Sequence, residues 1–317
     1  MPRTTDDLPI DEIRRRYADK PVSPHILKRL QRDSREGARR LYESLRKRYE
    51  RERGERTRLA AMRHFELVLW KTGVRDIAGV DEAGVGPLAG PVVAAAVMFP
   101  PDTHIDGVDD SKKLDAATRE KLAADIRAKA SGIGVGVCSV AEIDDINIYH
   151  AALLAMRRAV EGLPRPPQHV LVDARTVPGI GMPQNAFNKG DGLNFSIAAA
   201  SIIAKTARDA MMEALDREHP GYGFAAHKGY PTAEHREAFL KLGPCPHHRM
   251  SFPVIHEMLG EYAPVFYTLR EKLFASETRD ALGAFEAALK ADGERLSEAE
   301  YRKLRQLVLR RWKVVAA

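Results

Sequence analysis

The stretch DIAGVDEAGVGPLAGPVVAAAV, residues 76–97, decides the fold of this chain. It holds two short apolar runs on either side of a glycine-rich connection, EAGVGPLAG at 82–90. Apolar runs of this length, bounded by Gly and Pro, are typical of buried strands. The stretch therefore predicts two strands of one sheet. The first of them ends in an acidic pair, Asp81 and Glu82.

The residues that follow continue this pattern of strands. Apolar runs at 132–140 and 169–174, and a weaker one at 184–189, predict three more strands. Stretches at 114–130, 147–163 and 195–219 predict helices, the first with Asp115 as its N-cap. Two strands in succession, followed by strands that alternate with helices, indicate an α/β sheet covered by helices.

Helical extensions are expected on both sides of this sheet. Residues 23–70 contain few Gly or Pro residues and carry leucines at helical spacing. Ser23 followed by Pro24 is a helix start signal, and Gly37 and Gly54 are expected to divide the region into two or three short helices. The tail from about 265 predicts two or three more helices. We therefore expect a basic helical N-terminal extension (1–75), a central α/β domain (76–264) and a helical C-terminal extension (265–317).

The charge of the chain is unevenly distributed over these three parts. Residues 1–75 hold 21 Lys/Arg against 12 Asp/Glu, and 265–317 hold 11 against 8. The centre, 76–264, holds 18 against 24 and is therefore acidic. A basic arm raises the local concentration of nucleic acid. Basic helices with solvated Arg faces explain the same charge equally well, so charge alone leaves both interpretations open.

Composition excludes several classes of protein. The chain has 317 residues, 44% of them hydrophobic, and two cysteines, Cys138 and Cys245. It has no apolar run of about 20 residues, so a transmembrane helix is not expected. The start, MPRTTDDLPIDEIRRRY, has no apolar segment of the kind found in secretory leaders. Two cysteines exclude a disulfide scaffold and fit a reducing compartment. These features predict a cytoplasmic protein.

Four carboxylates form a candidate metal site. Asp173 ends the buried run VLVD, where a carboxylate is costly unless it meets a cation or hydrogen-bond donors. Asp209 shares one face of a predicted helix with Lys205, four residues earlier. Taken alone, Asp173 or Asp209 is better explained as a cap or a surface carboxylate. Together with Asp81 and Glu82 they favour a hard-cation site for Mg²⁺ or Mn²⁺, of the two-ion kind that cleaves phosphodiesters.

A zinc site is not expected from the sequence. Cys245, His247 and His248 lie close together, but no second Cys or His stands at the spacing of zinc ligands. His248 and Arg249 are expected to pack or to contact the backbone instead.

Six blocks, in this order, resemble ribonuclease HII, the type 2 ribonuclease H. They are VDEAGVGPLAGPVVAAAV (80–97), DDSKKL (109–114), LVDAR (171–175), KGD with SIAAASIIAKTARD (189–209), YGFAAHKGYPT (222–232) and HHRMSF (247–252). The resemblance runs from Asp76 to about Ile255. The N-terminal arm is similar to an extension found on some bacterial members, and we know no counterpart for the tail after about 265.

The resemblance implies a ribonuclease H-like fold, in which a mixed five-stranded sheet is flanked by helices. It implies that the first and fourth strands lie side by side, which would bring Asp81 and Glu82 beside Asp173. The residues implied as catalytic acids and ligands of Mg²⁺ or Mn²⁺ are Asp81, Glu82, Asp173 and Asp209.

The resemblance also implies how substrate is bound. The implied substrate-binding residues are Gly84, Val85, Gly86, Lys112, Lys205 and Tyr230. Tyr230 matches the tyrosine that stacks at the ribose beside the scissile bond, and the lysines match basic positions near the phosphates. Val85 departs from the family, which usually has Arg between the two glycines. The glycines that allow close backbone approach to the 2′-hydroxyl remain, whereas a charged contact is lost.

The implied activity is that of a metal-dependent endoribonuclease. It would hydrolyse the RNA strand of RNA–DNA hybrids and cut at ribonucleotides in duplex DNA, by a two-metal mechanism that leaves 3′-hydroxyl and 5′-phosphate ends. A monomer with no membrane partner is expected. Two alternatives are a ribonuclease HIII-like enzyme, which also lacks Arg between the glycines, and a nucleic-acid-binding module without catalysis. The aspartate at 209 weighs against the first, and the presence of all four acids weighs against the second.

Overall fold

The computed structural model describes residues 9–18 and 20–315. Residues 1–8, on which the expectation of no secretory leader partly rests, lie outside the described residues. Among the helices formed by the described residues, none is both long and apolar enough to cross a membrane. The chain divides into two compact units. The first comprises the described residues up to Val85 with 92–138 and 152–208, and the second comprises 86–91, 139–151 and the residues from Asp209 onward.

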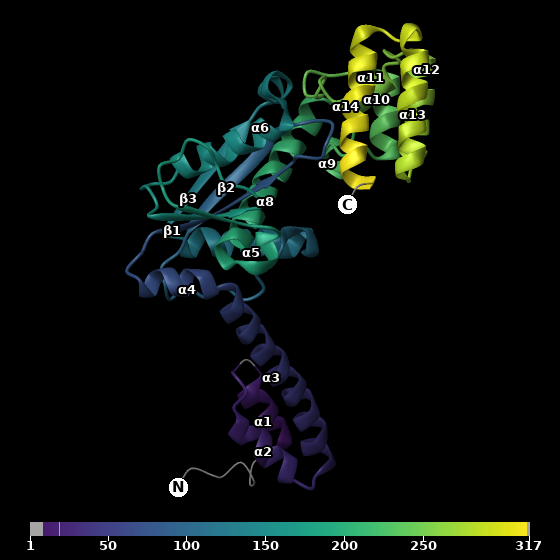
Figure 1. Ribbon diagram of the computed structural model, residues 1–317. Coiled ribbons are helices and arrows are strands. Elements are labelled where there is room, and N and C mark those ends of the chain that lie inside the picture. Colours follow the sequence, from purple (N-terminus) through teal and green to yellow (C-terminus); the bar gives the residue numbers. More distant parts are fainter. Residues whose placement is uncertain (1–8, 19, 316–317) are drawn as a thin grey trace. The chain divides into compact units, whose positions relative to one another are not determined.

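A five-stranded sheet in the order β3-β2-β1-β4-β5 forms the centre of the first unit (Figure 1). The strands are β1 (Ile77–Ala83), β2 (Val92–Met98), β3 (Gly132–Cys138), β4 (His169–Asp173) and β5 (Gln184–Phe187). β2 pairs antiparallel with β1 and β3, whereas β4 pairs parallel with β1 and β5. The mixed sheet, and the first and fourth strands as neighbours, are therefore confirmed.

Helices cover both faces of this sheet. One face packs on α5 (Ala116–Lys129) and on the first part of α8 (Phe195–Glu218), in a core that includes Ala95, Val97, Leu122, Ile126, Ala198 and Ile202. The other face meets the second part of α6 (Val140–Glu161), whose backbone approaches the β3 glycines closely. Asp115 caps α5 as expected, because its carboxylate accepts a hydrogen bond from Thr118 N at 2.8 Å. A short helix, α7 (Gly190–Leu193), precedes α8.

Gly79 on β1 sets how closely the strand and α8 approach each other. A Cβ built at this position would lie 2.1 Å from the backbone carbon of Ser196, at the start of α8. The contact is with backbone, which cannot rotate away as a side chain can. Glycine at 79 therefore allows the first turn of α8 to lie directly on β1, two residues before Asp81.

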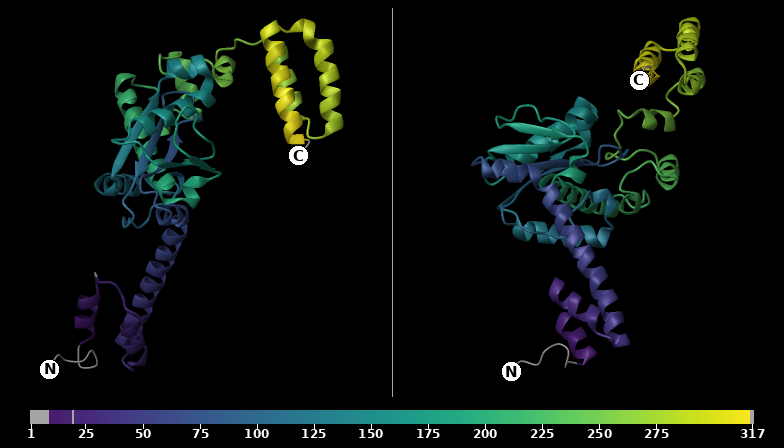
Figure 2. Two further views of the ribbon diagram at one scale, coloured as in Figure 1. Left: turned by 60° about the vertical axis from the view of Figure 1, so that its left-hand side comes forward. Right: turned by 60° about the horizontal axis from the view of Figure 1, so that its bottom comes forward.

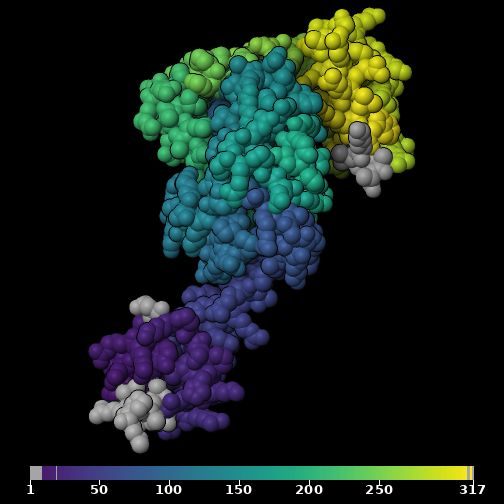
Figure 3. Space-filling model, turned by 90° about the vertical axis from the view of Figure 1, so that its left-hand side faces the viewer, coloured from purple at the N-terminus to yellow at the C-terminus, as the bar shows by residue number. Residues whose placement is uncertain are grey.

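The N-terminal arm is helical and has a core of its own. Its helices are α1 (Ile10–Tyr17), α2 (Pro24–Arg32), α3 (Glu36–Met62) and α4 (His64–Lys71). Buried residues that include Ile13, Leu27 and Leu41 form an apolar core between helices α1, α2 and α3. The N-terminal part of the arm is purple in Figure 3. Ser23 is the N-cap of α2, as predicted, because its hydroxyl accepts from Ile26 N.

The prediction that Gly37 and Gly54 would end helices was wrong. Both lie inside α3, which runs without interruption for 27 residues. A glycine inside a helix costs only about 1 kcal/mol relative to Ala. Ion pairs one turn apart, such as Arg40 with Glu36 and Arg58 with Glu55, line this helix and offset that cost.

The second unit carries the remaining helices. They are α9 (Phe224–His227), α10 (Ala233–Leu242), α11 (Pro253–Met258), α12 (Pro264–Ala275), α13 (Arg279–Asp292) and α14 (Glu298–Val315). The last three lie side by side around a separate apolar core that includes Phe266, Leu282 and Leu304 (Figure 2). The helical tail predicted from about 265 is thus confirmed as three helices.

Candidate active site

Three of the four predicted carboxylates meet at the end of β1 and β4. The register pairs Val80 with Val172, so that Asp81 and Asp173 follow on adjacent parallel strands and point to the same face, the one covered by α8. Pairing between β1 and β4 stops at Val80, which lets the longer Glu82 side chain reach the same place from the strand end. One carboxylate oxygen from each of these three acids lies within 4.8 Å of the other two.

The electrostatics of these three acids fit a site for cations. Burial raises the pKa of Asp81 well above its usual range, and the neighbouring charge of Glu82 adds to this. Burial and the charge of Asp173 likewise raise the pKa of Glu82. Glu82 Oε2 is buried and has no hydrogen-bond partner within the described part of the chain. Converging acidic oxygens that lack sufficient donors are the environment that a hard divalent cation satisfies.

Asp173 is held in place by the backbone of the KGD segment. Gly190 N donates a hydrogen bond of 2.6 Å to Asp173 Oδ1. The next residue, Asp191, is buried and lies 3.6 Å from the ammonium of Lys112. Lys112 comes from the short 3₁₀ helix Ser111–Lys113, and the nearby charges of Asp191 and Asp81 raise its pKa against the effect of burial. Lys112 thus lies next to the acidic cluster, whereas Asp191 was missed although it belongs to one of the six blocks.

The two predicted residues on α8, Lys205 and Asp209, lie along one helical face together with Ser201. Ser201, Lys205 and Asp209 follow each other at intervals of four residues on the uninterrupted helix. Ser201 Oγ donates to Ser111 Oγ at 2.6 Å, which turns this face of α8 toward the segment that carries Lys112. Asp209 belongs to the second unit and is partly buried.

The glycine loop and Tyr230 have the features expected of a surface that contacts a ribose. Gly84 has φ +96°, a conformation that favours glycine. A Cβ on Gly86 would lie 3.6 Å from the Tyr230 ring, so Gly86 and the ring are in close proximity. The Tyr230 side chain is 44% exposed, and its backbone N and O are both hydrogen-bonded. Val85 is exposed between the two glycines.

The expectation that His248 and Arg249 contact the backbone is confirmed, whereas the hydrogen bonds that link His248 through His235 to Tyr230 were missed. His248 Nδ1 accepts from Cys245 N at 3.0 Å, and its Nε2 lies 3.1 Å from His235 Nε2. His235 Nδ1 in turn lies 2.9 Å from the carbonyl oxygen of Tyr230, which can only accept. Both histidines are therefore neutral with defined tautomers: His248 donates to His235, and His235 donates to Tyr230. Arg249 is also fully buried and donates to the carbonyls of Pro87, Gly90 and Pro91 in the segment that follows Gly86.

Comparison with known proteins shows the family of this chain. The sequence model of the family described as Ribonuclease HII matches residues 78–255. The chain belongs to the ribonuclease HII family. A second match, described as the Ribonuclease HII N-terminal domain, covers residues 9–70 and confirms the resemblance seen in the arm. Neither match reaches α12–α14, for which the sequence offered no counterpart.

Curated relatives cover most of the chain. Ribonuclease HII of Myxococcus xanthus (strain DK1622) is 54% identical over 241 residues, which are 76% of this chain and 82% of that protein. Ribonuclease HII of Anaeromyxobacter sp. (strain Fw109-5) is 48% identical over 274 residues, 86% of this chain and 85% of that protein. Among solved structures, ribonuclease H2 from Pyrococcus horikoshii OT3 covers 59% of this chain and 98% of its own, at a TM-score of 0.51 and 26% identity.

Family membership decides between the hypotheses drawn from the sequence. Ribonuclease HII is a metal-dependent endoribonuclease family, and its general reaction is hydrolysis of the RNA strand of RNA–DNA hybrids by a two-metal mechanism. The enzyme hypothesis and the ribonuclease H-like fold are therefore confirmed. The ribonuclease HIII and non-catalytic alternatives do not describe the family that is matched.

Proposed function

We propose that Asp81, Glu82, Asp173 and Asp209 hold two divalent cations, Mg²⁺ or Mn²⁺, at the scissile phosphate of an RNA-containing duplex. The observation that carries the proposal is the convergence of three carboxylates within 4.8 Å at the ends of β1 and β4. Bound there, the cations would supply an activated water and stabilise the leaving 3′-oxygen, which gives 3′-hydroxyl and 5′-phosphate ends. The oxygen-only set of donors suits Mg²⁺ and Mn²⁺ alike.

Asp209 is proposed as the fourth ligand from its place on α8. Its helical face also carries Ser201, which hydrogen-bonds Ser111 next to Lys112. The resemblance to the family implies this residue as a catalytic acid together with the three clustered acids. The role of Asp209 predicts that Asp209→Asn, which keeps the shape of the side chain, abolishes cleavage.

The proposed substrates are RNA–DNA hybrids and DNA duplexes with embedded ribonucleotides. Gly84 and Gly86 would present backbone groups to the 2′-hydroxyl, and the Tyr230 ring would pack on the ribose. A site built to hydrogen-bond a hydroxyl strongly rejects a substrate that lacks it, because buried polar groups are then left unpaired. Val85 offers no charged donor, so recognition at this loop would depend on backbone atoms.

Lys112 and Lys205 are proposed to contact phosphates. The ammonium of Lys112 is exposed, although its nearest partner is the buried Asp191 at 3.6 Å. Asp191 would thereby orient the Lys112 side chain, and the Lys112 ammonium would still face solvent and be able to contact a phosphate. The basic arm, residues 1–75, is proposed to add non-specific contacts with the duplex backbone.

The proposed location is the cytoplasm, and the proposed state is a monomer. Cys138 and Cys245 are both buried and form no disulfide within the described residues, which suits a reducing compartment.

Single-turnover cleavage in Mg²⁺ tests this function. Three duplexes would be compared: an RNA–DNA hybrid, a DNA duplex with one ribonucleotide, and the same duplex without it. Cleavage of the first two with a 5′-phosphate product is expected, and the third should remain intact. Asp173→Asn should abolish cleavage, whereas Asp106→Asn, which changes an exposed carboxylate, should not. Cleavage of the all-DNA duplex, or activity in Asp173→Asn, would disprove the assignment.

A further inference from the structure

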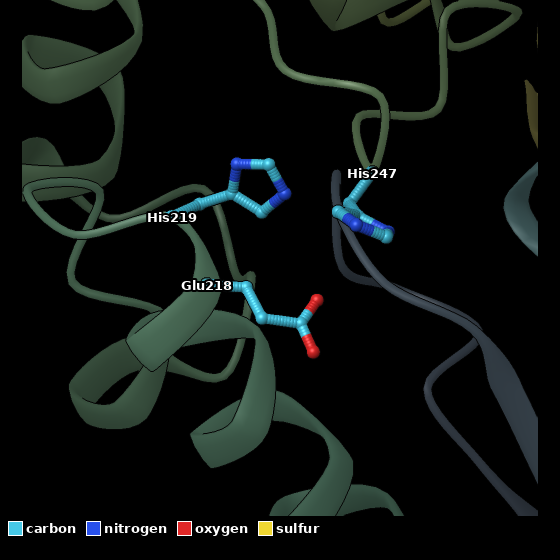
Figure 4. A group of neighbouring side chains, drawn as sticks. All are labelled: Glu218, His219 and His247. Carbon is cyan, nitrogen blue, oxygen red and sulfur yellow. The ribbon is translucent and has the colours of Figure 1, made fainter.

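A second group of potential metal ligands lies in the second unit, at the end of α8. Glu218 is the last residue of the helix and His219 follows it, while His247 lies in the loop before the buried His248. One ligand atom from each of these three residues lies within 4.8 Å of the other two. Figure 4 shows the Glu218 carboxylate and the two imidazole rings projecting into the same space from the helix end and from the facing loop.

The backbone holds two of the three residues in position. His219 N donates to Leu215 O at 2.9 Å and continues the helical pattern, and the His247 carbonyl accepts from Gly90 N at 2.9 Å. The residue after His247, His248, is fixed by hydrogen bonds at both of its ring nitrogens. Two histidines on fixed backbone, with one exposed carboxylate free to rotate, form a partly preorganised set of ligands.

The donor types select a different class of ion from the acidic cluster. Imidazole nitrogen with one carboxylate oxygen suits Zn²⁺, Co²⁺ or Ni²⁺, whereas Mg²⁺ prefers oxygen alone. Zinc bonds of about 2.0–2.1 Å place tetrahedral ligands about 3.3 Å apart, so rotation of the Glu218 side chain and small ring movements would close the site. The centroids of the His219 and His247 rings lie 4.9 Å apart, and their planes are inclined at 65°, so the rings meet edge to face rather than stacking. Burial and the neighbouring His219 lower the pKa of His247.

We propose that Glu218, His219 and His247 form a binding site for one zinc-class divalent cation, completed by water and distinct from the acidic cluster. The ion fastens the C-terminal end of α8 to the loop that carries His247, and through the His247–Gly90 hydrogen bond to the segment after Gly86. The sequence argument against zinc considered ligand spacing along the chain, whereas residues 219 and 247 are brought together only by the fold. Cys245 is not included, because its thiol is buried and that burial raises its pKa.

Competition titration of the full-length, metal-free protein tests the proposal. Zn²⁺ would be titrated against a chromophoric chelator in excess Mg²⁺, which occupies the acidic cluster, and again in Asp81→Asn. One zinc-binding equivalent is expected in both proteins. His219→Gln and Glu218→Gln change residues at the helix end and should weaken Zn²⁺ binding at least about tenfold. His104→Gln is the matched control, because its ring also lies 2.8 Å from a carboxylate, that of Asp106, and this variant should bind as tightly as the wild type.

Two further measurements identify the ligands. Zn²⁺ should shift the imidazole nitrogen resonances of two histidines, and the shifts should disappear in His219→Gln and His247→Gln. Zn²⁺ should raise the Tm of the wild type in excess Mg²⁺ and raise that of His219→Gln much less. Equal affinity in the wild type and His219→Gln, or an equal loss in His104→Gln, would overturn the proposal. Neither result would bear on the catalytic acids, because the acidic cluster is tested by cleavage.

Discussion

His235 and His248 meet nitrogen to nitrogen, with their Nε2 atoms 3.1 Å apart. Only one of the two can carry the proton between them. Because His248 Nδ1 accepts from Cys245 N and His235 Nδ1 donates to the Tyr230 carbonyl, both rings are neutral while these contacts are intact. Burial lowers the pKa of His248 from 6.5 to about 4, and the proximity of His235 adds to the effect. The backbone of Tyr230 depends on this pair, because His235 Nδ1 donates to its carbonyl.

This pair predicts a loss of stability in mild acid. The unfolded chain takes up a proton on His248 near pH 6.5, whereas the folded chain resists protonation until about pH 4. The neutral His248 therefore contributes at most about 3 kcal/mol to the free energy of unfolding. This contribution is complete above pH 6.5 and is lost as the pH falls to about 4. We expect the free energy of unfolding of His248→Phe to be lower at pH 7 but to fall less steeply across this window. Denaturant unfolding at several pH values measures both, with His25→Phe as an exposed control; equal pH slopes in the wild type and His248→Phe would contradict the prediction.

Asp81→Asn should abolish cleavage and yet stabilise the metal-free protein. Burial and the charge of Glu82 raise the pKa of Asp81, so its ionised form destabilises the folded state when no cation is bound. The free energy of unfolding of the metal-free variant should exceed that of the wild type by on the order of 1 kcal/mol at neutral and higher pH. This difference should disappear at low pH, where the wild-type carboxyl is protonated. Thermal unfolding with and without Mg²⁺ checks this. A lower Tm for the metal-free variant would show that the carboxylate has a structural partner instead.

Val85→Arg should tighten binding without creating a new activity. An Arg between Gly84 and Gly86 adds charged donors, worth about 1 kcal/mol or roughly fivefold in Kd if the contact is partly exposed. The natural protein should already cut at single ribonucleotides, because both glycines and Tyr230 are present. Binding and cleavage of hybrid and single-ribonucleotide duplexes by both proteins measure this. If only the Arg variant cut at the single ribonucleotide, backbone recognition would be refuted.

Deletion of residues 1–53 should weaken substrate binding and flatten its salt dependence. It removes 16 Lys/Arg against 10 Asp/Glu. It retains Glu55 and Arg58, which hydrogen-bond Gly107 N and Val108 O of the sheet-bearing unit. Each lost phosphate contact should reduce the log–log salt slope by about 0.9, with little change in rate at saturating substrate. Arg29→Gln with Arg32→Gln is the matched test of charge alone, and an unchanged slope in the deletion would assign the arm a structural or protein-binding role.

Glu66→Ala should destabilise the protein although Glu66 belongs to the arm. The buried Glu66 carboxylate accepts hydrogen bonds from Ser196 N, Ser196 Oγ and Asn194 Nδ2 at 3.1, 2.8 and 3.2 Å. Its removal leaves buried donors at the start of α8 unsatisfied, which costs about 3 kcal/mol or more in free energy of unfolding. Glu43→Ala, on the exposed face of α3, should cost little. Similar denaturation midpoints for the two variants would contradict this role.

The sequence predicts much of the fold because each strand of the sheet has a local sequence pattern of its own. Alternation, glycine loops and apolar runs predict the five strands, and the family resemblance orders them. The proximity of Asp81 and Asp173 follows from that order alone. Three of the four acids that the sequence singled out, Asp81, Glu82 and Asp173, therefore lie at the ends of strands, where local pattern and tertiary position coincide. Asp209 lies on α8 instead.

Other functional contacts have no local signal. Glu66 and Ser196 are 130 residues apart in the chain, and His235 and His248 are separated by 13 residues of loop and helix. Each of these residues, taken alone, resembles an ordinary polar residue on a helix or loop. Whether such a side chain is buried, and against which donor, depends on packing that no short window of sequence contains. Gly37 and Gly54 illustrate the reverse error, because a real helix-weakening signal is overridden by the surrounding ion pairs.

The close contact of Gly79 with the first turn of α8 constrains how this protein can vary. An added methyl group would meet the backbone of Ser196, so no change of a neighbouring side chain can make room for it. A substitution there would displace β1 and carry Asp81 with it. Position 79 is therefore as intolerant of mutation as a catalytic residue, although no atom of it touches metal or nucleic acid. An inactive variant at this position has lost geometry rather than chemistry, and no choice of metal ion or substrate would restore it.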